Sequence, residues 1–122
     1  MTLGAFSMSL SVNNLADSRT FYEALGFKVF HDQSQHGWLI MQCGDSVIGL
    51  FEGMFEGNIM TFNPGWDQNG QAIDPFNDVR AIEQSLRDQG VEISSGTQSD
   101  EGPDRITLTD PDGNVIMVDQ HR

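Results

Sequence analysis

The chain of 122 residues contains 18 acidic and only 6 basic residues, so its formal net charge is −12. This charge argues against nucleic-acid backbones and anionic membranes as partners, because both would repel the protein. The length suits a single domain. The chain contains no run of about 18 apolar residues, so no membrane span is expected. The only cysteine, Cys43, has no partner for an internal disulfide, which fits a reducing cytoplasm.

The first half of the chain predicts one helix among four strands. Apolar residues at positions 6, 8, 10 and 12 alternate with serines, which is the period of a strand with one polar face. A helix is expected from about Asp17 to Leu25, because Gly26 follows as a suitable residue for ending it. Further strands are expected at residues 27–30, 37–42 and 46–51. This half therefore has the order β-α-β-β-β.

The second half repeats this order. Asn77-Asp78-Val79 matches Asn13-Asn14-Leu15 at an offset of 64 residues, and the segment 115–118 matches 47–50 at an offset of 68. An amphipathic helix is expected from Val79 to Gly90, with strands at 59–62, 91–94, 104–109 and 115–118. The sequence Asp-Pro-Asp-Gly (110–113) predicts a type I turn between the last two strands. Two such modules within one short chain indicate an internal duplication.

Two stretches resemble a known family. They are VNNLADSRTFYEALGFKV at residues 12–29 and DPDGNVIMVDQ at residues 110–120. Together they are similar to segments of the vicinal oxygen chelate domains, the superfamily of glyoxalases, bleomycin-resistance proteins and extradiol dioxygenases. The resemblance implies a single α+β domain of two β-α-β-β-β modules, at about 5–53 and 57–120, forming a U-shaped mixed sheet. It also implies a ligand in the trough of that sheet and a homodimer.

The resemblance further implies four metal-ligand positions in the trough, and here the sequence departs from the family. Three of them fall on Ser7, Gly49 and Met117, and the fourth falls on Asn58 or, by repeat spacing, on Gln71. Strand quality favours Asn58, because Asp74-Pro75 interrupts the alternative strand. A hydroxyl, a thioether, an amide and a glycine lack the charge that binds a divalent metal tightly. We therefore expect no metal or other cofactor.

Other residues offer only partial sites. The fallback metal ligands are His31, His36, Asp119, His121 and Gln71. Asp119 and His121 share strand parity, yet two side chains make only half a metal site. Glu52 and Glu56 are candidate bases, because a carboxylate desolvated beside aromatic rings can have a raised pKa; a solvated carboxylate is the alternative interpretation.

The expected trough is rich in methionine and aromatic residues, which adapt to irregular organic ligands but also build ordinary cores. Its candidate lining, beyond the four positions above, consists of Trp38, Met41, Phe51, Met60, Phe62 and Trp66. Trp66 lies in the long irregular segment 63–75, which we expect to form an ordered lid or a dimer contact.

Three functions follow from these observations. The first is metal-independent binding of a small organic molecule, similar to that of bleomycin-resistance proteins. The second is a glyoxalase-like lyase or isomerase, or a dioxygenase, that uses a relocated metal or a carboxylate base. The third is a non-catalytic module that pairs with another protein.

Overall fold

The computed structural model describes residues 1–122 and divides into two compact units. The N-terminal unit contains Ser7–Ile59, and the C-terminal unit contains Met1–Phe6 together with Met60–Arg122. Neither helix of the chain has the length and apolar character needed to cross a membrane.

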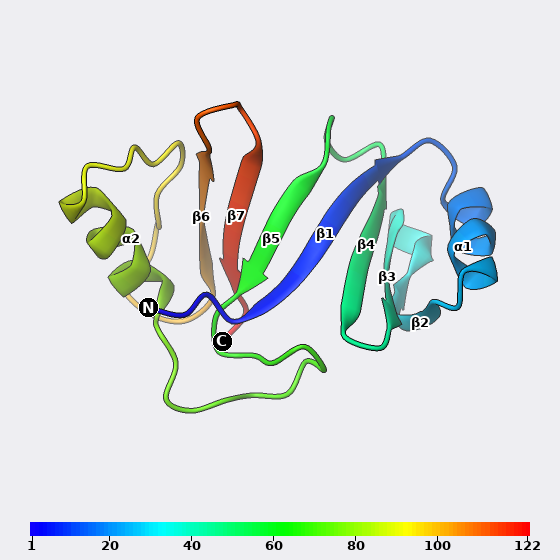
Figure 1. Ribbon diagram of the computed structural model, residues 1–122, viewed down its shortest axis with the longest axis horizontal. Helices are drawn as coiled ribbons and strands as arrows, with labels where there is room; N and C mark the ends of the chain where they lie inside the picture. Colours follow the sequence, from blue (N-terminus) through cyan, green and yellow to red (C-terminus); the bar gives the residue numbers. More distant parts are fainter. The chain divides into compact units, whose positions relative to one another are not determined.

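The N-terminal unit is a four-stranded sheet with one helix on it (Figure 1). Its elements are β1 (Ala5–Val12), α1 (Leu15–Ala24), β2 (Lys28–Gln33), the 3₁₀ turn η1 (Ser34–His36), β3 (Trp38–Cys43) and β4 (Ser46–Glu52). The strand order is β2-β3-β4-β1, in which β1 runs parallel to β4 and the other pairs are antiparallel. The helix covers a core of Leu15, Leu39, Met41 and Leu50. Leu39 and Leu50 are opposite each other in the β3–β4 register, so this face of the sheet belongs to the helix.

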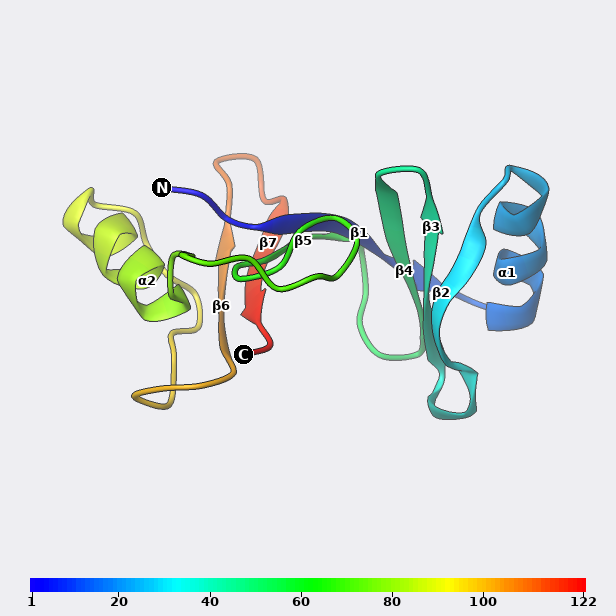
Figure 2. The ribbon, with the colours of Figure 1, turned by 90° about the horizontal axis from the view of Figure 1, so that it is seen from below.

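The C-terminal unit repeats the plan with three strands. Its elements are β5 (Ile59–Asn63), α2 (Val79–Asp88), β6 (Asp104–Thr109) and β7 (Val115–Gln120), in the strand order β5-β7-β6. Figure 2 shows α2 beside β6, and the core beneath α2 contains Val79, Ile82, Ile106, Leu108 and Val118. The turn predicted at Asp-Pro-Asp-Gly is confirmed, because the N–H of Gly113 donates to the carbonyl of Asp110 at 3.1 Å.

The first residue of each helix is hydrogen-bonded to the side chain of the last residue of the final strand in the same module. The backbone N–H of Leu15 donates to Glu52 Oε1 at 2.9 Å, and the N–H of Val79 donates to Gln120 Oε1 at 2.7 Å. The first N–H groups of a helix have no partner within the helix, so each bond satisfies a donor that would otherwise be orphaned. The two acceptors are 68 residues apart and the two donors 64, the same offsets as in the sequence repeat.

One predicted strand is wrong. Residues 91–94 form no strand, and this region makes only an isolated bridge between Ser95 and Thr107. Both Ser94 and Ser95 donate their N–H groups to the same carbonyl of Thr107, which is a local contact and not the start of a ladder. The following loop is held by side chains instead: Arg80 donates to the carbonyls of Ser99 and Gly102.

Replacing Gln120 with leucine should destabilise the protein. Gln120 is only 2% exposed, and its Nε2 also donates to Asp78 Oδ2 and to the carbonyl of Arg122. The substitution leaves the Val79 N–H buried without a partner, which costs about 1–3 kcal/mol. Urea unfolding should show this loss, and the exposed control Gln98→Leu should change the unfolding free energy by less than about 0.5 kcal/mol. Equal effects of the two variants would contradict the capping role.

Candidate functional site

An aromatic row lies on the face of the N-terminal sheet that α1 does not cover. Trp38 and Phe51 are paired in the β3–β4 register and stack with ring centroids 5.8 Å apart at an interplanar angle of 20°. Phe55, just beyond β4, lies 5.4 Å from Phe51, and the ring of His31 lies 5.5 Å from Trp38. The side chains of Trp38, Phe51 and Phe55 are partly exposed, so their ring surfaces can take part in binding.

Gly49 makes room for this row. A β-carbon at position 49 would lie 2.6 Å from Cε1 of Phe51 and 3.2 Å from Cδ1 of Ile40. The first distance is far below van der Waals contact, so no side chain fits there while the Phe51 ring keeps its place. Ser9 is paired with Gly49 in the β1–β4 register and is 5% exposed. Ser7 precedes it by two residues and therefore lies on the same face.

The residues at the four expected metal positions do not fit a metal ion. The ring of Phe51 occupies the space above Gly49, and the side chain of Asn58 accepts a long hydrogen bond (3.4 Å) from the N–H of Ser11. Met117 is paired with Thr107 and lies between Ile116 and Val118, which pack on the core beneath α2. Its thioether therefore projects from the opposite face of the sheet. Gln71 is exposed in the loop before α2. Within each unit no three His, Cys, Asp or Glu side chains come together as metal ligands.

The two candidate bases have different surroundings. Glu52 is two residues after Leu50 in β4, so its side chain lies on the same face of the sheet as Leu50, the face covered by α1. There its carboxylate accepts the first N–H of α1, away from the aromatic row. Glu56 is exposed in the turn after β4. The structure therefore gives Glu52 a structural role and places neither carboxylate in a desolvated pocket.

The structure separates the other expected lining residues. Met41 is fully buried in the core beneath α1, on the opposite face from Trp38, because adjacent strand positions alternate. Phe62 and Trp66 line an open pocket of about 560 Å³ in the C-terminal unit, together with Leu3 and Ile73. Met60 is half-buried in β5.

The segment expected to form a lid is ordered within the C-terminal unit, where Figure 1 shows it between β5 and α2. Trp66 forms a bridge with Ala72, and its indole stacks on His121 with centroids 5.1 Å apart. Arg122 holds the segment by donating to the carbonyls of Gly65 and Ile73, and its guanidinium lies 4.4 Å from the centroid of the Phe76 ring. Sequence reasoning missed this role of Arg122, because nothing local connects the last residue with a loop some 50 residues earlier.

The three histidines do not converge. His36 is exposed in η1, His31 lies beside Trp38, and His121 lies in the C-terminal unit. Nε2 of His121 is 3.2 Å from Asp119 Oδ2, so these two side chains lie side by side. The hydrogen bond to Asp119 raises the pKa of His121 above its ordinary value of 6.5, although partial burial opposes the shift.

Comparison with known proteins identifies the family. The family model of the glyoxalase/bleomycin resistance protein/dioxygenase superfamily matches residues 4–118. The chain belongs to this superfamily. A comparison with curated proteins finds no match.

Solved structures share the fold of this family member. A superfamily member from Vibrio splendidus 12B01 is 14% identical with a TM-score of 0.67, over 94% of this chain and 97% of that one. A protein from Legionella pneumophila described as an NAD-dependent benzaldehyde dehydrogenase is 16% identical with a TM-score of 0.70, over 96% and 99%. An extradiol ring-cleaving dioxygenase from B. fuscum is 20% identical with a TM-score of 0.61, over 94% of this chain and 31% of its own. At these identities the likeness concerns the fold alone.

Adding a methyl group at Gly49 should destabilise the N-terminal unit through Phe51. Gly49→Ala overpacks the site and should lower the free energy of unfolding by about 1–3 kcal/mol. In a Phe51→Leu background the same substitution should cost clearly less, because the clashing ring edge is gone. A double-mutant cycle in urea measures the difference, and strictly additive costs would show that Phe51 does not occupy this space.

The fluorescence of Trp66 should report the protonation of His121. In a Trp38→Phe variant, a pH titration should show a midpoint above 6.5, and Asp119→Asn should move it to 6.5 or below because only the effect of burial remains. Since the folded-state pKa is raised, the linked stability is complete below pH 6.5 and is lost as the pH rises through the folded value. An identical midpoint in both variants would contradict the Asp119 contact.

Proposed function

We propose that this protein binds a small organic molecule on the aromatic row of Trp38, Phe51 and Phe55 and uses no metal ion to do so. The observation that carries the proposal is the ring of Phe51 over Gly49, because it replaces a metal-ligand position of the family with an apolar surface. Stacked and tilted aromatic rings suit a flat ligand, and contacts of this kind contribute about 0.5–1.5 kcal/mol each beyond the buried area.

The polar groups near the aromatic row suit the binding of an organic ligand better than the binding of a metal ion. The half-buried Ser7 supplies a hydroxyl group on the same sheet face, which can orient a ligand by hydrogen bonds but cannot hold a divalent cation alone. The net charge of −12 favours a neutral or cationic ligand over an anionic one. The homodimer implied by the family resemblance stays a prediction, which light scattering of the purified protein tests.

Binding should be measurable through Trp38 alone. In a Trp66→Phe variant Trp38 is the only tryptophan, so quenching of its emission by planar organic compounds reports the row directly. For the compounds that bind, Phe51→Ala should weaken the affinity about tenfold or more, since a full aromatic contact is lost. Phe30→Ala is a matched control, because Phe30 is exposed on β2 and has no ring contact with the row.

Two results would contradict the proposal. One is an affinity that depends on an added divalent metal and disappears with a chelator. The other is an equal loss of affinity in Phe51→Ala and Phe30→Ala, which would place the binding surface elsewhere.

A further inference from the structure

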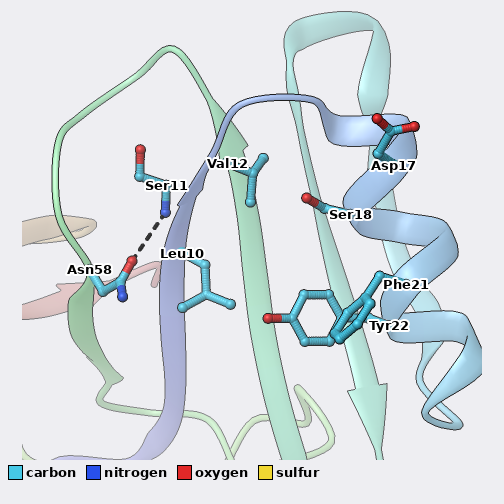
Figure 3. Close-up of a pocket in the computed structure, with 8 residues that line it drawn as sticks. All are labelled: Leu10, Ser11, Val12, Asp17, Ser18, Phe21, Tyr22 and Asn58. Atoms are coloured by element: carbon cyan, nitrogen blue, oxygen red, sulfur yellow. Dashed lines mark hydrogen bonds between the residues drawn. The ribbon is translucent and has the colours of Figure 1, made fainter.

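A groove in the N-terminal unit lies on the helix side of the sheet, away from the aromatic row. It has a volume of about 460 Å³ and runs between α1 and the end of β1 (Figure 3). Leu10 and Val12 form its apolar floor, and both pack against the core beneath α1. Leu10 and Val12 alternate with Ser9, so the floor of the groove lies on the face opposite the aromatic row, while Ser11 also lines the groove.

Two adjacent aromatic side chains form the helix wall of the groove. The rings of Phe21 and Tyr22 meet edge to face with centroids 5.2 Å apart. Tyr22 reaches inward, and Figure 3 shows its hydroxyl pointing toward Leu10. Phe21 is 60% exposed, which leaves its ring available to a ligand.

A carboxylate without a partner stands at the rim of the groove. Asp17 precedes Phe21 by one helical turn, so the two side chains share one side of α1. Its carboxylate forms no hydrogen bond or ion pair within the chain, and the neighbouring Arg19 is directed instead to Glu23 and Asp32. Across the groove, Asn58 contributes an amide.

We propose that this groove binds the ammonium group of a small organic cation with an apolar body. Cations are attracted to the faces of aromatic rings, and the carboxylate of Asp17, one helical turn before Phe21, supplies the opposite charge in the same groove. The apolar floor of Leu10 and Val12 then receives the body of the ligand. The excess of acidic residues throughout the chain adds a long-range attraction for cations and disfavours a second copy of the protein in the groove.

The proposal predicts a charge-selective response to matched probes. 2-Phenylethylammonium should shift the amide NMR signals of α1 in a saturable titration, whereas the neutral 2-phenylethanol should bind at least threefold more weakly. Added salt should weaken the ammonium probe, since the site is open to solvent. Equal affinity for the two probes would overturn the proposal.

Variants separate the two features of the site. Asp17→Asn and Phe21→Ala should each weaken the ammonium probe about three- to fivefold, and Asp17→Glu should restore most of the affinity. Asp100→Asn is the charge-matched control, because it removes one carboxylate from an exposed loop of the other unit and should leave the affinity unchanged. Equal losses in Asp17→Asn and Asp100→Asn would show that only net charge matters.

The experiment also separates this groove from the aromatic row. The amide shifts caused by 2-phenylethylammonium should be confined to α1 and the end of β1 and should spare Trp38 and Phe51, because their rings lie on the other face of the sheet. A loss in Phe51→Ala with none in Phe21→Ala would move the cation to the row and overturn the proposal. A change of molar mass in Phe21→Ala, seen by light scattering, would show instead that the groove is an interface between copies of the chain.

Discussion

The fold of each module depends on one hydrogen bond that ties the end of its last strand to the start of its helix. Glu52 accepts from the N–H of Leu15, and Gln120 accepts from the N–H of Val79. In both modules the bond fixes where the helix begins over the sheet, and the apolar side chains that follow are thereby placed on the core. The same contact made by an acid in one copy and an amide in the other indicates that geometry matters more than charge. Glu52 is consequently committed to a structural role.

The sheet face opposite the helix is shaped by the pair of Gly49 and Phe51. In the N-terminal unit the absence of a β-carbon at Gly49 lets the ring of Phe51 lie over the strand, where it stacks with Trp38. A chelating side chain and this ring cannot occupy the same space. The local chemistry is therefore that of an apolar platform with serine hydroxyls beside it, which matches ligand binding better than Lewis-acid catalysis.

Much of the fold could be predicted from the sequence because its signals are local and repeated. The alternation in β1, the Val/Ile-rich arm of β7 and the turn at Asp110–Gly113 each specify structure over a few residues, and the offsets of 64 and 68 connect the two modules. The strand expected at 91–94 is absent because the N–H of Val91 bonds back to the carbonyl of Leu86 in α2 and the N–H of Ser94 reaches only the carbonyl of Thr107, so no ladder forms. Because Glu52 and Leu50 are two residues apart in one strand, their side chains lie on the same face of the sheet. Once the face covered by the helix is known, this spacing is enough to place Glu52 beside the helix.

The site could be predicted only in part. The alternation of residues along a strand shows which side chains share a face, but it does not show which of the two faces the helix covers. Trp38 and Met41 belong to one strand, yet Trp38 joins the aromatic row and Met41 the core. Phe55 lies outside any strand, and its contact with Phe51 depends on the path of the turn after β4. The role of Arg122 depends on contacts between distant parts of the chain, which no sequence pattern indicates.

The central proposal is that the protein binds its ligand without a metal ion, and its most direct test is the metal content of protein purified without chelator. This measurement should be paired with thermal-shift titrations against nickel, zinc, manganese and cobalt. The account predicts substoichiometric metal and no increase in melting temperature with any of the four ions, because Gly49 offers no ligand and Phe51 fills the space. One tightly bound metal per chain, with a stabilising shift that a chelator reverses, would contradict it.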